Sequence, residues 1–257
     1  MLVAAGQQAH HHHKPLSVRT MIEFGHLSHP GLIRPLNEDT YHGDAALGLW
    51  LVADGMGGSG RGDVASAMAR DAIVRQVRSG ATLEAAIRQA DTEIFAASRQ
   101  RPGSGVLPMG TSVVCARRKG GHFHLAWAGD CRAYHWQGGR LTRVTADTDQ
   151  PSTPSHRSPP ATRAAERLAG ARPSVNQALG VTDASHLTVA SATVACQPGM
   201  QLLLCSDGLS EEITHAQMAV ILSAQDCSAQ ETVDTLVAAA LEAGGSDNIT
   251  AILIRAL

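Results

Sequence analysis

Four short apolar runs along the chain each lie next to an aspartate, and three of these aspartates stand beside a glycine. The runs with their acids are 48–53 with Asp54, 123–128 with Asp130, 200–205 with Asp207, and 249–254 with Asp247 just before it. Apolar runs of this length, bounded by turn residues, are typical of buried strands. The aspartates are therefore expected at strand ends. Carboxylates gathered at one edge of a sheet repel one another unless a cation neutralises them, so the pattern predicts a divalent-metal site.

Asp-Gly between two strands is also a strong signal for a tight hairpin, so each pair taken alone is compatible with a simple turn. The surrounding sequence favours the other interpretation. Asp54 and Gly55 are followed by a glycine-rich stretch through Gly60 that is too long for a tight hairpin, and then by a helical pattern. Asp207 and Gly208 are likewise followed by a helix-like segment.

The composition excludes several classes of protein. The formal net charge is -2 and no Lys/Arg cluster is present, which argues against a nucleic-acid partner. No apolar run approaches the roughly 18 to 20 residues needed to cross a bilayer. The five cysteines contain no CxxC pair, which favours reduced, buried thiols in a cytosolic protein. At 257 residues the chain can form one domain with a large core, and we expect a cytoplasmic monomer without a membrane partner.

The order of predicted elements indicates an α+β fold. Strands are expected at 17–26, 48–53, 111–117, 122–128, 131–137, 140–145, 186–195, 200–205 and 249–254. Two helices follow the second strand, with a cap at Thr82, and two follow the strand at 200–205, with capping boxes at Thr214–Gln217 and Ser228–Glu231. This order predicts antiparallel sheets packed together with helices outside.

Two segments are expected to lie outside the regular fold. Residues 1–16, which include four consecutive histidines, His10 to His13, are predicted to form a disordered tail, and residues 17–257 a single domain. The proline-rich segment at about 149–173 is predicted to form a loop or flap, with one short helix at 161–168.

The acids form a set with only oxygen ligands, because no His or Cys cluster accompanies them. Such ligands suit Mg²⁺ or Mn²⁺ better than Zn²⁺ or Cu²⁺. Two such ions about 3.5 to 4 Å apart can share a hydroxide and direct it at a phosphorus atom. Arg34 stands close before the acid pair and can grip phosphate oxygens with two hydrogen bonds. The candidate acids are Glu38, Asp39, Asp54, Asp130, Asp207 and Asp247.

Seven stretches resemble, in order, the motifs of the metal-dependent Ser/Thr protein phosphatases of type 2C, the PPM family, in its bacterial form. They are 34–39 (RPLNED), 52–58 (VADGMGG), 109–112 (MGTS), 128–132 (AGDCR), 178–180 (ALG), 205–209 (CSDGL) and 246–250 (SDNIT). The resemblance implies a central antiparallel β-sandwich flanked by helices, in four layers α/β/β/α. It also implies a metal cluster at one edge and hydrolysis of phosphoserine and phosphothreonine by a metal-bridging hydroxide, without a phosphoenzyme.

The resemblance also implies roles for single residues. Asp54 would bridge two metal ions, and the carbonyl of Gly55 would bind one of them. Asp207 and Asp247 would hold the other ion, and Asp130 with Asp207 a third. Glu38 and Asp39 would reach the cluster directly or through water, and Arg34 would bind the phosphate. Thr111, Ser112 and Asn248 would be structural.

Three departures from the family pattern bear on mechanism. Met56 replaces a histidine that animal members carry as a proton donor, so a metal-bound water, on the ion at Asp130, would have to supply the proton. Cys131 replaces a serine and is either a buried filler or an oxidation target, the filler being favoured. The segment after Asp147 lacks the usual Asp-His-Ser, so substrate preference does not transfer from relatives.

The resemblance implies phosphorylated proteins as substrates and a bacterial Ser/Thr kinase as the opposing enzyme, with members encoded beside type VI secretion kinases among the analogues. Two alternatives remain open. One is a pseudophosphatase that binds a phosphoprotein without turnover, although no metal ligand is lost. The other is a sigma-factor-regulatory phosphatase of the same fold, although those members usually carry sensor or membrane domains.

Overall fold

The computed structural model describes residues 20–57, 61–99, 108–146, 177–182, 185–224 and 226–257. The predicted tail at 1–16 lies outside these residues. So do the predicted flap and its short helix.

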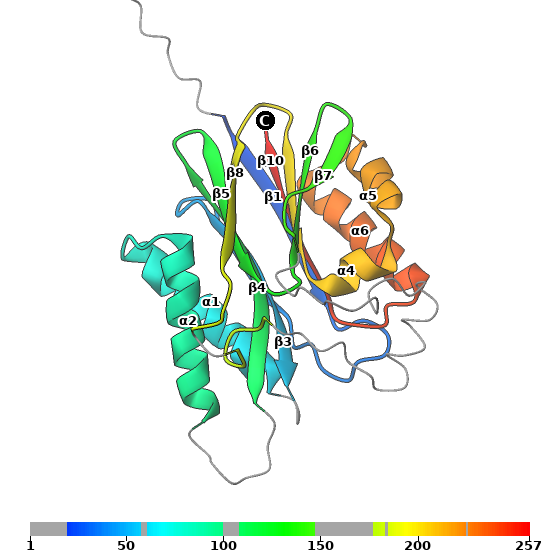
Figure 1. Cartoon of the computed structure of the whole chain (residues 1–257). Coiled ribbons are helices and arrows are strands. Elements are labelled where there is room, and N and C mark those ends of the chain that lie inside the picture. The colour runs from blue at the N-terminus through cyan, green and yellow to red at the C-terminus, as the bar shows by residue number, and fades with distance from the viewer. Residues whose placement is uncertain (1–19, 58–60, 100–107, 147–176, 183–184, 225) are drawn as a thin grey trace, which may run out of the picture.

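Ten strands of the described chain form two antiparallel five-stranded sheets (Figure 1). The first sheet has the order β1 (Ile22–His29), β10 (Ile249–Ala256), β9 (Gln201–Cys205), β6 (Arg132–Gln137) and β7 (Arg140–Arg143). The second sheet has the order β2 (Thr40–Asp44), β3 (Leu49–Gly57), β4 (Met109–Lys119), β5 (His122–Ala128) and β8 (Ala190–Ala195). All neighbouring strands pair antiparallel, as the order of elements predicted.

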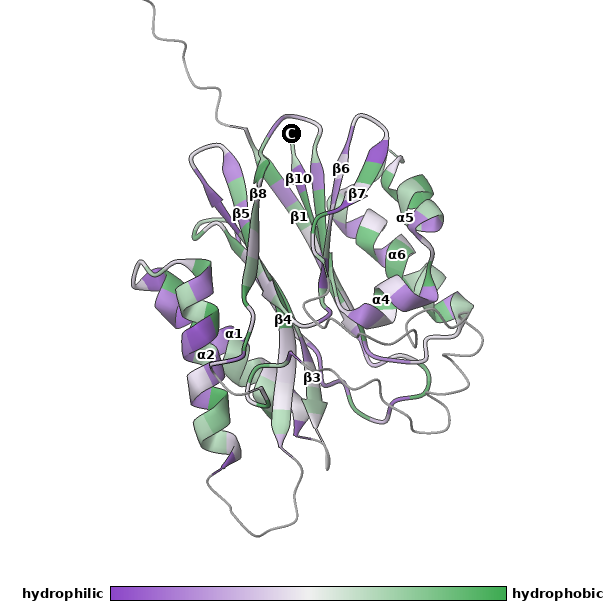
Figure 2. Ribbon diagram, viewed as in Figure 1, coloured by the Kyte–Doolittle hydropathy of each residue, from purple (hydrophilic) through white to green (hydrophobic). Residues whose placement is uncertain are grey.

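Helices cover the outer face of each sheet, which completes the four layers (Figure 1). The helices α1 (Gly62–Arg78) and α2 (Leu83–Ser98) lie on the second sheet. The helices α4 (Asp207–Glu212), α5 (His215–Leu222) and α6 (Ala229–Ala243) lie on the first sheet. Three clusters of buried apolar residues fill the three interfaces between layers, one under each group of helices and one between the sheets. Figure 2 shows apolar residues on the strands and helices of all four layers. The expected α+β sandwich is therefore confirmed.

Side chains on the two faces of a central strand belong to two different buried clusters. In β3, Leu49 and Leu51 pack toward α1 and α2, whereas Trp50 and Val52 pack between the sheets. Successive side chains of a strand point to opposite faces, so a strand covered on both sides reads as a continuous apolar run. This is why the runs were visible in the sequence.

The helix caps follow the sequence prediction closely. The hydroxyl of Thr82 accepts a hydrogen bond from the Ala85 amide at the start of α2. Both predicted capping boxes form, at Thr214 before α5 and at Ser228 before α6. The helix α1 has no side-chain cap at Arg61. A carboxylate from elsewhere in the chain takes that place, as described below.

Some strand boundaries differ from the prediction. The strand β2 is not among the predicted strands, because all five of its residues are only half-buried and give no apolar run. The strand β3 continues to Gly57, so Asp54 lies within the strand and opposite Ser112, not at its end as predicted. The strand β8 begins at Ala190, four residues later than the expected start at His186.

Candidate metal centre

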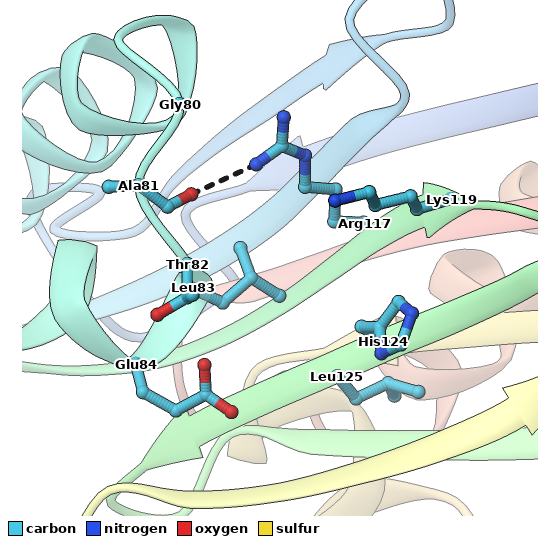
Figure 3. Close-up of a pocket in the computed structure, with 9 residues that line it drawn as sticks. All are labelled: Gly80, Ala81, Thr82, Leu83, Glu84, Arg117, Lys119, His124 and Leu125. Carbon is cyan, nitrogen blue, oxygen red and sulfur yellow. Dashed lines mark hydrogen bonds between the residues drawn. The ribbon is translucent and has the colours of Figure 1, made fainter.

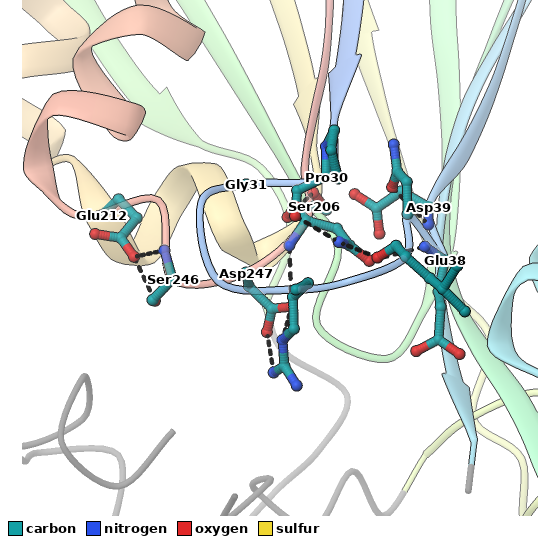
Figure 4. Close-up of polar contacts among 12 residues, drawn as sticks. Pro30, Gly31, Glu38, Asp39, Ser206, Glu212, Ser246 and Asp247 are labelled. Atoms are coloured by element: carbon teal, nitrogen blue, oxygen red, sulfur yellow. Dashed lines mark hydrogen bonds and ion pairs between the residues drawn. The ribbon is translucent and has the colours of Figure 1, made fainter. Parts of the chain in front are cut away.

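Asn248 fastens the segment that carries the first acid pair to the start of β10. Its side-chain oxygen accepts a hydrogen bond from the Glu38 amide at 2.8 Å. Its side-chain nitrogen donates to the carbonyls of Pro30 at 2.9 Å and Leu36 at 2.8 Å. One buried amide thus fixes three backbone positions of the 30–38 segment next to Asp247, and Figure 4 shows the polar contacts around it.

Glu38 links this segment to the end of β3 and the start of α1. Its carbonyl accepts hydrogen bonds from the Gly55 amide at 3.2 Å and the Ser66 hydroxyl at 2.7 Å. Its carboxylate accepts from the Gly62 amide at 2.9 Å, at the first residue of α1, where a negative charge is favourable. A Cβ at Gly55 would lie 2.1 Å from the Gly62 carbonyl oxygen, so this approach requires glycine.

Asp54 and Asp130 are placed by hydrogen bonds and close packing around β4. Thr111 donates its hydroxyl to the Asp54 carbonyl at 2.7 Å. Gly129 has a φ of +96°, and a Cβ there would lie 2.3 Å from the Ser112 Cβ. The turn that carries Asp130 therefore lies directly against the strand that pairs with Asp54.

Asp207 and Asp247 come from the first sheet. Asp207 is buried and is the first residue of α4, two residues after the end of β9, and Asp247 lies two residues before the start of β10. A Cβ at Gly208 would lie 2.0 Å from the Asn248 carbonyl oxygen, so the start of α4 packs tightly against the residues that carry Asp247. Ser246 is held in turn by Glu212, whose carboxylate accepts from the Ser246 amide at 2.9 Å (Figure 4).

The acids interact electrostatically around Asp54. Burial raises the pKa of Asp54 well above its ordinary value, and nearby negative charges raise this pKa further. Those charges belong to Asp39, Asp207, Asp130 and Asp247. The structure therefore brings together the five aspartates that the sequence singled out, from both sheets.

Asp39 is a buried acid at the centre of this set. Burial raises its pKa to about 7, and the charges of Asp207 and Asp247 contribute to the rise, whereas the hydroxyls of Thr250 and Ser206 oppose it. Among the described residues, neither carboxylate oxygen of Asp39 has a hydrogen-bond partner. The two hydroxyls bond elsewhere, Thr250 to Ser28 at 2.8 Å and Ser206 to the Thr250 amide at 3.0 Å. A buried carboxylate without a partner is costly, and a cation would supply the missing interaction.

Arg34 lies beside these acids, and its guanidinium forms an ion pair with one of them, Asp247. Its Nε and Nη2 donate to the two oxygens of Asp247 at 2.8 and 2.9 Å. Each side chain is about one-fifth exposed, 22% for Arg34 and 21% for Asp247. The fork that was predicted to bind phosphate therefore faces the acid cluster and neutralises one member of it.

The donor set fits Mg²⁺ or Mn²⁺, because carboxylate oxygens are the ligands these ions prefer. In the described part of the chain, no three His, Cys, Asp or Glu side chains are already arranged to hold an ion. Two carboxylates of the set are engaged by other groups, since Arg34 donates to both oxygens of Asp247 and the Gly62 amide donates to an oxygen of Glu38. Metal binding would require some of these carboxylates to turn toward Asp39 and Asp54.

Sequence reasoning missed two residues that shape the site. Ser66 and Glu212 hold the backbone of Glu38 and Ser246 through contacts across 28 and 34 residues. Neither residue belongs to a local motif, so no pattern in the sequence marks it.

A cavity of about 300 Å³ lies between the α1–α2 turn and the ends of β4 and β5, and none of the residues that line it is a candidate acid (Figure 3). Arg117 borders it and donates to the Ala81 carbonyl at 2.9 Å. Thr111 and Ser112 lie five or more residues earlier on β4, which places the acids about 15 to 20 Å away. The cavity is not part of the candidate metal centre.

The family model for protein phosphatase 2C matches residues 35–243, which run from Pro35 through α6 and include the strands β2 to β9 but not β1 and β10. The chain belongs to the protein phosphatase 2C family. Among relatives, the serine/threonine phosphatase stp of Listeria innocua is 30% identical over 242 residues, covering 88% of this chain and 92% of that protein. The serine/threonine protein phosphatase PstP of Mycobacterium tuberculosis is 28% identical over 242 residues, covering 92% of this chain but only 45% of PstP. This chain thus spans less than half the length of PstP.

Solved structures also align with this protein phosphatase 2C member over most of its length. One is PppA, described as a key regulatory component of T6SS in Pseudomonas aeruginosa, with a TM-score of 0.75 and 30% identity over 92% of this chain and 98% of that one. Another is the catalytic domain of PstP in complex with two manganese ions, with a TM-score of 0.74 and 26% identity over 92% and 98%. The bacterial family resemblance in the sequence is therefore confirmed. Within the described residues, every helix is too short or too polar to span a membrane.

Proposed function

We propose that this chain hydrolyses phosphoserine and phosphothreonine in proteins and depends on two or three Mn²⁺ or Mg²⁺ ions. The observation that carries the proposal is the cluster of five aspartates beside the Arg34 guanidinium, in which Asp39 and Asp207 are buried and both oxygens of Asp39 lack a hydrogen-bond partner among the described residues. Such a cluster has no evident use without cations, and such an arginine is suited to a phosphate. The manganese ions in the PstP structure support the same choice of metal.

The ligand roles follow from the position of each acid. Asp54 and the Gly55 carbonyl lie on the second sheet and would contact one ion, with Asp54 reaching a second. Asp207 and Asp247, from the first sheet, would hold that second ion. Asp130 would join Asp207 at a third ion, and Glu38 and Asp39 would act from the connecting segment. When bound, these ions supply positive charge and lower the pKa of water so that it can attack phosphorus at neutral pH.

Arg34 would bind the phosphate. Its guanidinium is planar and forks onto two oxygens, and the geometry it shows on Asp247 is the one it would offer to phosphate oxygens. If the Arg34 guanidinium leaves Asp247 to bind phosphate, the Asp247 carboxylate would become available to a metal ion. Met56 contributes no proton, because a thioether has none to give.

The first experiment measures phosphate release from a phosphothreonine peptide, with and without Mn²⁺, for the wild type and Asp207→Asn. We expect metal-dependent turnover in the wild type and a loss of at least a hundredfold in the variant, because the variant removes a charged ligand. Calorimetric metal binding without turnover in the wild type would instead identify a pseudophosphatase.

We further propose that the chain acts against a bacterial Ser/Thr kinase, in the cytoplasm and as a monomer. The similarity to stp, a serine/threonine phosphatase, and to PppA, a regulatory component, supports a role in the control of protein phosphorylation. The test is incubation of the autophosphorylated kinase encoded nearest to this chain with the wild type and with Asp207→Asn. Dephosphorylation by the wild type alone is the expected result.

A further inference from the structure

Three large apolar side chains are exposed on the segment that carries Arg34. Leu32 is 65% exposed, Ile33 47% and Leu36 55%. We call these three residues the 32–36 apolar patch. Single exposed apolar residues are common on protein surfaces, but several grouped beside a functional site mark a place where another molecule binds.

The backbone under the 32–36 apolar patch is held in place. The Leu32 amide donates to the Gly245 carbonyl at 2.7 Å, and the Leu36 carbonyl accepts from Asn248 at 2.8 Å. Gly31, with a φ of +79°, turns the chain where a Cβ would lie 2.2 Å from the Asp247 carbonyl oxygen. The side chains are therefore exposed because a fixed backbone presents them.

The patch residues stand on both sides of Arg34 in the chain, and the Arg34 guanidinium faces the acid cluster. Arg34 lies between Ile33 and Leu36 in the chain, and its guanidinium is on Asp247. Consecutive Cα atoms are about 3.8 Å apart, so each patch residue begins within about 8 Å of Arg34 along the backbone. An extended peptide advances about 3.3 Å per residue. A peptide whose phosphate is bound by Arg34 therefore brings its next one to three residues over the patch.

We propose that the 32–36 apolar patch binds an apolar side chain of the protein substrate, one to three residues away from the phosphorylated serine or threonine. This inference rests on the proposed function, since it names the substrates that the same site selects. A single methylene group in a hydrophobic pocket is worth about 10- to 200-fold in kcat/KM, so a whole apolar side chain bound on this patch should be worth at least about tenfold. The phosphatase should therefore prefer phosphosites with Leu, Ile, Val or Met neighbours to sites with Ser or Gly neighbours.

The test compares two phosphothreonine peptides that differ only at the three residues before and the three residues after the phosphothreonine. In the apolar peptide these residues are Leu and Val, and in the polar peptide they are Ser and Gly. The reference substrate is p-nitrophenyl phosphate, which has no flanking residues. The wild type should show kcat/KM about tenfold or more higher for the apolar peptide. In the double variant Ile33→Ser with Leu36→Ser, the ratio of kcat/KM for the apolar peptide to that for p-nitrophenyl phosphate should fall about tenfold. The matched control is Val220→Ser on α5, which removes an apolar side chain that is 71% exposed and far along the chain.

The outcomes separate this inference from the proposed function. Metal-dependent hydrolysis of p-nitrophenyl phosphate with equal rates on both peptides overturns the patch and leaves the phosphatase intact. Equal losses on all substrates in the double variant also overturn it, because they indicate a structural role. A wild-type dimer that becomes a monomer in the double variant would mean that a second copy occupies the patch. Fluorescence anisotropy of both peptides bound to Asp207→Asn tests the same preference without turnover, and equal affinities would reject it.

Discussion

Cys131 is buried, and its environment favours the neutral thiol. Burial, followed by the charges of Asp54 and Asp130, raises its pKa well above the ordinary value. Its sulfur hydrogen-bonds the Ser112 hydroxyl at 2.9 Å, so it fills the space between β4 and the turn that carries Asp130. Because the thiolate is the reactive form, this geometry supports the role of a filler over that of an oxidation target.

We therefore predict that iodoacetamide at pH 8 leaves Cys131 unmodified in the folded protein and modifies the half-buried Cys227 first. Tryptic mass spectrometry over time measures both sites, with 6 M guanidinium as the control in which both react. Modification of Cys131 at the rate of Cys227 would contradict the buried, protonated thiol.

Asn248 shows how one residue stabilises the site. Its replacement by alanine leaves the Glu38 amide and the carbonyls of Pro30 and Leu36 without their partner. Unpaired buried polar groups cost about 1 to 3 kcal/mol each, so we expect a loss of about 3 kcal/mol in the free energy of unfolding. Urea denaturation measures it. The control is Thr235→Ala, whose exposed hydroxyl bonds only within α6 and whose loss should cost less than about 0.5 kcal/mol. Equal effects would show that the 30–38 segment is held by other contacts.

At the scale of elements, the local signals were the most informative ones. Thr82, Thr214 and Ser228 cap their helices as the sequence indicated, because capping depends on residues within one turn. The start of α1 was not predictable in this way, since its cap is the Glu38 carboxylate, 24 residues away. The strand β2 was missed because its stability comes from pairing with β3 and not from its own apolar content. The acids were found by motif, whereas their contacts with Arg34, Ser66 and Glu212 depend on the tertiary fold.

The capping box of α6 gives a prediction at this scale. In Ser228→Ala the Glu231 amide loses its acceptor and the Ser228 hydroxyl no longer bonds the Glu231 carboxylate. We expect a loss of about 1 kcal/mol in the free energy of unfolding, measured by urea denaturation, and unchanged activity. The conservative variant Ser228→Asp keeps an acceptor at the cap and should retain most of the stability. A loss of equal size in both variants would mean that the cap does not stabilise α6.

At the scale of the whole molecule, the acids come from both sheets, and all but Asp54, which lies within β3, stand outside the strands. Asp54 belongs to the second sheet, and Asp207 and Asp247 to the first. Asp39 lies between β1 and β2, and Asp130 between β5 and β6, which in both cases are strands of different sheets. The candidate centre therefore joins the two halves of the sandwich at one edge. Cations bound there would stabilise the whole fold, while the same carboxylates without cations oppose the packing of the sheets.

This arrangement predicts opposite effects of Asp39→Asn on stability and on metal binding. Without metal, the variant removes a buried charge that has no partner, so its melting temperature should rise by a few degrees. With Mn²⁺ at about one hundred times its dissociation constant, the wild type should gain about 2.7 kcal/mol, or roughly 5 to 10 °C for a chain of this size. The variant should gain much less, because it has lost a ligand of the cluster. Differential scanning calorimetry in EDTA and in Mn²⁺ measures all four values. If Mn²⁺ raised the melting temperature of both proteins equally, Asp39 would lie outside the centre, and its burial would serve the packing of the two sheets alone.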